Sequence, residues 1–157
     1  MVSTKRRGAT AAASHHSVFV DTTVLVAAAV RAHPHHDRSS AVLSALGPRT
    51  GFCAAHSLAE LYATLTALPI VPRIHPADAA AAVRHRAQSL HTVALSAEEQ
   101  LQAVLTAAAR SATTGQVYDA LILAAAAKSD ADIIYTWNLR HFERFAEAST
   151  ARKLRLP

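Results

Sequence analysis

Residues 17–30 read SVFVDTTVLVAAAV, and this stretch decides the fold class. Its first part, SVFVD, is short, β-branched and aromatic, which is typical of a buried strand. The two threonines and the apolar run after it are typical of a helix start, so the strand carries Asp21 directly into the beginning of a helix. A strand followed at once by a helix predicts an α/β chain.

The same alternation continues along the rest of the chain. Further strands are predicted at 51–54 (GFCA), 91–95 (HTVAL) and 132–136 (DIIYT), and KLRL at 153–156 is a candidate edge strand. Helical patterns cover 34–46, 57–67, 76–90, 97–111 and 118–128, and a short helix begins near 139. Ser57 is the expected cap of its helix, and Ser96 with Glu99 forms a capping box. This order predicts a mainly parallel sheet covered on both faces, with ligands at the carboxyl ends of its strands.

Composition narrows the class of protein. The 157 residues fit one domain, predicted at 17–157, behind a mobile N-terminal extension at 1–16. The single cysteine, Cys53, excludes an internal disulfide and fits a reducing cytoplasm. No apolar run is long enough for a transmembrane helix, and the sequence after the basic start is too polar for a signal peptide. The net charge of +5 favours a polyanionic partner.

Three carboxylates stand apart from the other acids. Asp21, Glu60 and Asp119 are each the only Asp, Glu, Lys or Arg in a long stretch of otherwise uncharged sequence. Burying an ionised carboxylate without a partner costs several kcal/mol or more, so an acid among apolar residues needs a cation or a hydrogen-bond donor. Three such acids together indicate a shared metal ion.

The predicted elements allow these acids to meet. Asp21 ends the first strand, Glu60 lies on the helix after the second, and Asp119 lies in the first turn of its helix. Asn138 follows the DIIYT strand by two residues, so all four can converge at one edge of the sheet. The helix dipole should hold Asp119 ionised at neutral pH. Carboxylates with an amide oxygen form a hard site that suits Mg²⁺ or Mn²⁺ and phosphodiester hydrolysis.

Four segments carry a resemblance to a known family. VFVDTT (18–23), SLAELYATL (57–65), VYDALILAAA (117–126) and IIYTWNLRHF (133–142), in this order, resemble the PIN-domain ribonucleases, specifically the VapC toxins of type II toxin–antitoxin systems. The resemblance runs from Val18 to the carboxyl end. It implies a three-layer α/β/α sandwich and a Mg²⁺- or Mn²⁺-dependent endoribonuclease that hydrolyses structured RNA, such as tRNA or ribosomal RNA, to 5′-phosphate products. It also implies a homodimer and a VapB-like antitoxin.

The resemblance also assigns site residues. It implies that Asp21, Glu60 and Asp119 are catalytic metal ligands and that Asn138 fills a fourth position, which the family occupies with Asp or Asn. A neutral amide lowers the negative charge and should weaken a second ion. The hydroxyls expected to support these ligands are those of Thr22, Thr23 and Thr136. The expected RNA contacts are Arg140, Arg73, Arg84 and Trp137.

Other interpretations of these residues remain open from sequence alone. Asp21 could cap its helix, Glu60 could be a solvated helix acid, and Asp119 could be held only by the helix dipole. HPHH at 33–36 is interpreted as a polar helix start, since no zinc-site spacing follows it. As a function, a non-catalytic PIN-fold protein that binds RNA or antitoxin is the alternative. A phosphatase with an Asp21 nucleophile is set aside. Such an enzyme needs a second Asp two positions after the first, and Thr23 occupies that position.

Overall fold

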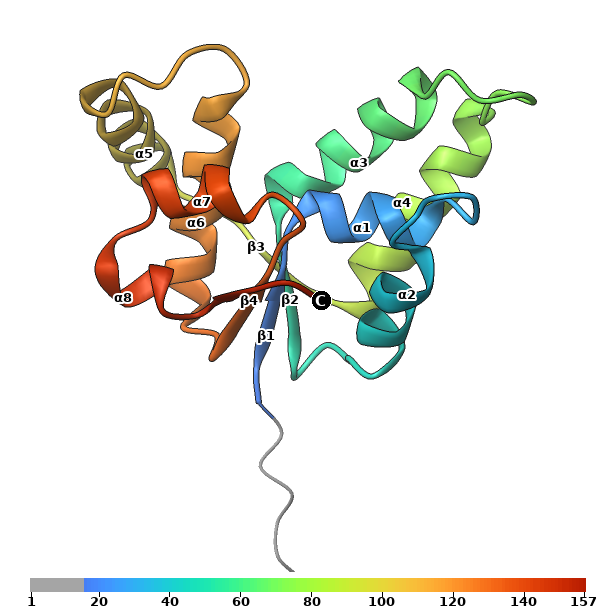
Figure 1. Ribbon diagram of the computed structural model, residues 1–157, viewed down its shortest axis with the longest axis horizontal. Helices are drawn as coiled ribbons and strands as arrows, with labels where there is room; N and C mark the ends of the chain where they lie inside the picture. Colours follow the sequence, from blue (N-terminus) through green and yellow to red (C-terminus); the bar gives the residue numbers. More distant parts are fainter. Residues whose placement is uncertain (1–15) are drawn as a thin grey trace, which may run out of the picture.

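A computed structural model describes residues 16–157 and contains a central sheet of five parallel strands (Figure 1). The predicted extension at 1–16 lies outside these residues except for His16. The strands are β1 (Val18–Val20), β2 (Gly51–Ala54), β3 (His91–Val93), β4 (Ile133–Tyr135) and β5 (Leu154–Arg155), in the spatial order β3-β2-β1-β4-β5. The candidate edge strand at the carboxyl end is confirmed, since β5 pairs in parallel with β4.

Helices cover both faces of this sheet, as the sequence predicts (Figure 1). On one side lie α1 (Thr22–Ala29), α2 (His36–Ser44), α3 (Ala55–Ala67) and α4 (Pro76–Ser89). On the other lie α5 (Ala97–Ala109), α6 (Gln116–Ser129), α7 (Leu139–Phe145) and α8 (Ala148–Ala151). The result is the predicted three-layer α/β/α sandwich. No helix within residues 16–157 is long and apolar enough to cross a membrane.

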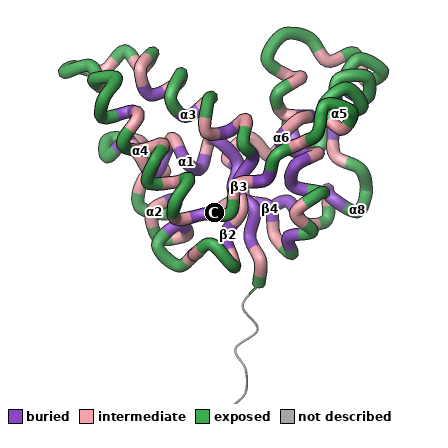
Figure 2. Tube along the Cα trace, turned by 180° about the vertical axis from the view of Figure 1, so that it is seen from behind, coloured by how far each residue is buried: buried purple, intermediate pink, exposed green. Residues whose placement is uncertain are grey.

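The side chains of the strands pack into two separate hydrophobic cores, one on each face of the sheet. Val18 and Val20 of β1 pack with the helices α1 to α4, whereas Phe19 between them packs with α6 and α7. β4 divides in the same way, with Ile134 in the second core. This alternation follows from the two-residue period of a strand. β1 is buried along its whole length, and β2 and β4 are buried or partly buried, so these strands are purple and pink in Figure 2, whereas the outer faces of the helices are green.

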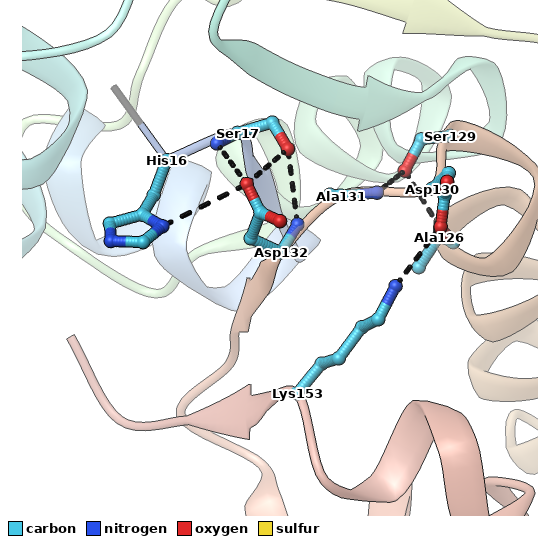
Figure 3. A network of polar contacts seen from close by, with 8 residues as sticks. All are labelled: His16, Ser17, Ala126, Ser129, Asp130, Ala131, Asp132 and Lys153. Atoms are coloured by element: carbon cyan, nitrogen blue, oxygen red, sulfur yellow. Dashed lines mark hydrogen bonds and ion pairs between the residues drawn. The ribbon is translucent and has the colours of Figure 1, made fainter. Parts of the chain in front are cut away.

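A polar network ties the starts of β1 and β4 together (Figure 3). The backbone N–H and the hydroxyl of Ser17 both donate to Asp132 Oδ2, at 2.8 and 2.9 Å. The backbone N–H of Asp132 donates back to Ser17 Oγ at 3.1 Å. These hydrogen bonds from Ser17 hold the pKa of Asp132 below its ordinary value. Asp132 therefore belongs to the amino-terminal end of the sheet, away from Asn138, as the strand length predicts.

Three local predictions differ from the structure. α3 begins at Ala55, so Ser57 is not its cap but a buried residue of its first turn, and its hydroxyl has no hydrogen-bond partner. The reason is that β2 runs directly into α3 without a connecting loop. The helix predicted to start at Tyr118 begins earlier, at Gln116. The short helix α8 was not predicted at all. The capping box at Ser96 and Glu99 is confirmed.

Candidate active site

The carboxyl ends of β1 and β4 form the switch point of the sheet. β1 connects through α1 and α2 to β2 on one side, whereas β4 connects through α7 and α8 to β5 on the other (Figure 1). Chains that leave two adjacent parallel strands in opposite directions open a crevice between them. Asp21 directly follows β1, and Thr136 to Asn138 directly follow β4, so both segments enter this crevice.

A pocket of about 550 Å³ occupies the crevice. Its lining includes all four residues predicted to form the site, supplied by the ends of β1 and β4 and by α3 and α6: Asp21, Glu60, Asp119 and Asn138. Thr22, Thr23 and Trp137 also line it. Residues far apart in the sequence therefore share one cavity, and the solvated-helix interpretation of Glu60 does not describe its position.

Asp21 lies at the bottom of the pocket and is only 2% exposed. Its backbone N–H donates to the carbonyl oxygen of Tyr135 at 2.9 Å, which pins it against β4. The hydroxyls of Thr23 and Thr136 both donate to its Oδ2, at 2.6 and 2.8 Å. Asp21 is the N-cap residue of α1, as the alternative interpretation held, but its side chain forms no capping hydrogen bond with the helix. Burial raises the pKa of Asp21, and the two hydroxyl hydrogen bonds offset part of that rise.

The same two hydroxyls also accept hydrogen bonds from the loop after β4. The backbone N–H of Trp137 donates to Thr23 Oγ1 at 3.0 Å, and that of Asn138 donates to Thr136 Oγ1 at 2.9 Å. Each threonine thus links the loop to the Asp21 carboxylate. We call Asp21, Thr23, Thr136 and these two backbone N–H groups the floor of the site.

Glu60 and Asp119 form the opposite, more exposed part, which we call the rim together with His56 and His141. Glu60 Oε2 accepts a hydrogen bond from Thr22 Oγ1 at 2.7 Å, while its Oε1 lies 4.0 Å from His56 Nε2. His141 Nδ1 lies 3.8 Å from Asp119 Oδ2. The imidazoles would form ion pairs with these acids only when protonated.

Asp119 carries the clearest electrostatic signature of the site. Burial, with further contributions from the charges of Asp21 and Glu60, raises its pKa from an ordinary 3.8 to about 6, against an opposing effect of His141. The expected stabilisation of the anion by the start of α6 is therefore outweighed, although the group is still mostly ionised at neutral pH. Asp21 and Glu60 both contribute to this shift, so Asp119 is the acid on which the other two act.

The donor set fits a hard divalent cation in its chemistry. All the candidate ligands offer oxygen, and Asp21 Oδ1 is left free of the hydroxyl hydrogen bonds that its Oδ2 accepts. Within residues 16–157, no three His, Cys, Asp or Glu side chains are gathered closely enough to hold an ion by themselves. Such an arrangement fits Mg²⁺ or Mn²⁺ bound through one or two carboxylates and several waters.

One wall of the pocket consists of aromatic rings, of which the sequence assigned only Trp137 to the site. His33 and His35, from the loop between α1 and α2, line the pocket beside Trp137. The His35 ring stacks on the Trp137 indole, with centroids 3.7 Å apart and planes 9° from parallel. We call His33, His35 and Trp137 the wall. The HPHH motif was the sequence signal for these histidines. It was interpreted as a polar helix start, which agrees with the start of α2 at His36 but did not predict that His33 and His35 line the pocket.

The predicted RNA-contacting arginines do not line the pocket. Arg140 is exposed in the first turn of α7, two residues after Asn138. Arg73 lies in the connection between α3 and α4, and Arg84 lies on the exposed side of α4. α3 and α4 extend beyond the sheet where they are joined (Figure 1), and Arg73 belongs to that connection, whereas Arg84 follows a part of α4 that packs on the core.

The chain is similar in sequence to known nucleases. The profile of the PIN domain family matches residues 18–148. Ribonuclease VapC27 of Mycobacterium tuberculosis is 37% identical to the chain over 114 residues, which cover 73% of this chain and 80% of that protein. All the residues that line the pocket fall within the range that the family profile matches.

Two solved structures share the fold. The toxin VapC20 of Mycobacterium tuberculosis, described as cleaving the sarcin-ricin loop, superposes with a TM-score of 0.66 at 19% identity, over 80% of this chain and 92% of that one. VapBC2 from Rickettsia felis, solved on a DNA fragment from its promoter, gives a TM-score of 0.55 at 16% identity, over 82% and 92% of the two chains. At these identities the likeness concerns the fold alone.

Proposed function

The chain belongs to the PIN domain family and is a VapC-like endoribonuclease, and from this premise we propose that it cleaves RNA with a divalent metal ion held by Asp21, Glu60 and Asp119. The observation that carries the proposal is their common pocket, in which burial, and after it the charges of Asp21 and Glu60, raise the pKa of Asp119. A cation bound in this pocket would offset the repulsion on Asp119 and stabilise its ionised form.

The proposed ligands have different parts. Asp21 and Asp119 would hold Mg²⁺ or Mn²⁺ directly, and Glu60 and the Asn138 amide would complete its surroundings. A bound ion of this kind activates water and stabilises the charge that develops on the leaving oxygen during phosphodiester hydrolysis. Since Asn138 is neutral, we propose one tightly bound ion rather than two.

The protein's own groups hold these ligands in place. Thr23 and Thr136 fix the orientation of the Asp21 carboxylate, and Thr22 fixes that of Glu60. His141 beside Asp119 favours the ionised carboxylate that a cation requires. The excess of five positive charges attracts the RNA, and Arg140 near Asn138 is the proposed phosphate contact, with Arg73 and Arg84 along the path.

The substrate, the partners and the compartment of the chain are further parts of the proposal. We propose a structured RNA, either tRNA or ribosomal RNA, consistent with the sarcin-ricin loop named for the structural neighbour VapC20. A VapB-like antitoxin, a homodimer and action in the cytoplasm complete the proposal. The VapBC2 neighbour and the single buried, free Cys53 support the antitoxin and the reducing compartment, respectively.

RNA cleavage by purified protein tests the function. Total tRNA and ribosomal RNA would be incubated with the protein in Mg²⁺ or in Mn²⁺, beside EDTA and an Asp119→Ala variant. Asp78→Ala is a matched control, because Asp78 is also a first-turn helix acid but lies on exposed α4. We expect discrete cuts with the protein and with Asp78→Ala, and none with EDTA or Asp119→Ala.

The opposite result has a defined meaning. If folded protein free of antitoxin cuts neither RNA pool with either metal, the catalytic proposal fails and RNA or antitoxin binding becomes the function. Cutting that persists in EDTA and in Asp119→Ala would instead place the chemistry outside the carboxylates.

A further inference from the structure

The wall of the pocket holds an aromatic stack that the hydrolysis itself does not use. Trp137 directly precedes Asn138, and its indole N–H donates to Ser39 Oγ at 2.9 Å. Ser39 is 0% exposed on α2, so this hydrogen bond anchors the indole to the core rather than to a mobile surface. The indole is further engaged by His35, which stacks on it, and by the Arg38 guanidinium, 5.2 Å from the ring centroid.

This arrangement changes the sequence-based view of Trp137. A base stacked on Trp137 was expected, but the ring is already engaged by His35 and Arg38. His35 is half-buried and lines the pocket together with the carboxylates. The stack therefore places an imidazole ring in the lining of the pocket, with the indole against one face and the His33 ring 5.5 Å away and tilted by 51°.

The imidazole is held in position before any ligand arrives. The backbone N–H of His35 donates to His33 Nδ1 at 3.1 Å, which requires that nitrogen to be unprotonated. Burial, assisted by the neighbouring His35 and His36, lowers the pKa of His33 and favours the neutral ring, in which this hydrogen bond places the proton on Nε2. The loop conformation and the backing indole thus fix the His35 ring on two sides. An ordered ring loses little conformational entropy when it binds a ligand.

We propose that His35 is a stacking platform for one unpaired nucleobase of the RNA, next to the phosphodiester that is cleaved. The inference rests on the proposed function and names a substrate-binding residue for it. A nucleobase matches the platform because it is flat and has a π-face whatever its identity. Arg38 beside the stack supplies positive charge for the adjoining phosphate. A base that stacks here must be unpaired, so the platform selects loops or distorted segments of a structured RNA over regular helices.

Kinetics on a short RNA containing the mapped cut site test the platform. His35→Ala should raise KM between about 5-fold and 150-fold, the range of base stacking on an aromatic side chain, with little change in kcat. His35→Phe keeps a flat ring and should retain most of the affinity. The matched control is His85→Ala, an exposed histidine of α4.

Abasic substrates separate stacking from a structural role. Each nucleotide flanking the cut would be replaced in turn by an abasic one, with the protein and with His35→Ala. At one position the abasic substitution should raise the KM of the unaltered protein by the same factor as His35→Ala, and the two changes together should add nothing further. Equal KM values for His35→Ala and the unaltered protein, or additive effects at every position, would overturn the proposal.

Binding without cleavage keeps this test separate from that of catalysis. Fluorescence anisotropy of the labelled RNA would be measured on an Asp119→Asn background, with and without His35→Ala. Weaker binding in the double variant supports the platform even where no cleavage is seen, whereas equal binding overturns it. Failure of cleavage alone counts against the proposed function and not against the platform.

Discussion

The floor and the rim of the site contribute carboxylates of the same kind but hold them in opposite ways. Asp21 in the floor is 2% exposed and accepts two hydroxyl hydrogen bonds from threonines. In the rim, the side chains of Asp119 and Glu60 are 17% and 27% exposed and have histidines at 3.8 and 4.0 Å. The floor is thus fixed by short hydrogen bonds that join β1 to the loop after β4, whereas the rim has one short hydrogen bond, from Thr22 to Glu60, and otherwise longer contacts with histidines.

This difference predicts that substitutions in the floor and in the rim affect folding stability and catalysis differently. Changing the floor should affect both folding and catalysis, because its hydrogen bonds join β1 to the loop after β4. Changing the rim should affect catalysis while relieving repulsion among the acids. Losing the hydrogen bonds of the floor should therefore lower folding stability and activity together, whereas removing the charge of Asp119 from the rim should lower activity and raise stability.

The largest effect is expected at Asp21. Asp21→Ala should abolish cleavage and also leave the hydroxyls of Thr23 and Thr136 without an acceptor, at about 1–3 kcal/mol of unfolding free energy for each. Asp21→Asn should be equally inactive but keep an oxygen for these hydroxyls. Chemical denaturation would compare the two variants. Equal stability of Asp21→Ala and Asp21→Asn would contradict a structural role for the floor.

Asp119→Asn should lose activity by more than about 100-fold, beyond the usual cost of losing a hydrogen-bond partner of a metal ligand. In the metal-free protein it should nevertheless raise the free energy of unfolding at neutral pH by about 1–3 kcal/mol, because the folded-state pKa is about 6 against an ordinary 3.8. Thermal denaturation in EDTA checks this, with Asp78→Asn as control. A less stable Asp119→Asn would mean that the rim is structural too.

The same substitution, Thr to Val, can be made once in the floor and once in the rim to compare the two. Thr136→Val removes a fully buried hydroxyl of the floor and should lower kcat/KM by about 10- to 100-fold, with a clear loss of stability. Thr22→Val removes the hydroxyl that holds Glu60 in the rim and should cost about 10-fold or less, with stability nearly unchanged. If Thr22→Val were the more damaging of the two, the floor would not be the main orienting element.

The smallest effect is a pH dependence from the rim. Because the folded-state pKa of Asp119 is raised, the folded protein binds more protons than the unfolded chain between about pH 4 and pH 6. Its contribution to the free energy of unfolding therefore falls as the pH rises through this window and is constant above it. Mn²⁺ affinity should change oppositely, rising about tenfold per pH unit up to about pH 6. Calorimetric titration at several pH values measures the affinity for Mn²⁺, and Asp119→Asn should flatten its dependence on pH.

The sequence predicted most of the fold because strand and helix periods are local properties. The GFCA strand and the Ser96 capping box are found where they were predicted, and β1 and β4 differ from their predicted ranges only at the ends. Ser57 was misassigned because a polar residue before a helical run normally caps it. Here β2 enters α3 directly, so burial of the first turn overrides that preference.

Isolated charge predicted the carboxylates of the candidate site, and the family resemblance predicted its uncharged members, including Asn138. Asp21, Glu60 and Asp119 stood out because they lack charged neighbours in sequence, and the parallel sheet explains why they meet. The platform at His35 gave no such signal. Its position depends on contact between the loop after α1 and Trp137, about 100 residues further along the chain, and on the buried Ser39 beneath it.

The hydroxyl bridges of the floor also have a direction. A threonine hydroxyl has one proton, and since Thr23 and Thr136 each accept a backbone N–H, that proton is committed to Asp21. Polarisation along such a chain makes each amide sensitive to the charge at its far end. The ¹⁵N–¹H resonances of Trp137 and Asn138 should therefore serve as spectroscopic reporters of the ionisation of a carboxylate that solvent hardly reaches.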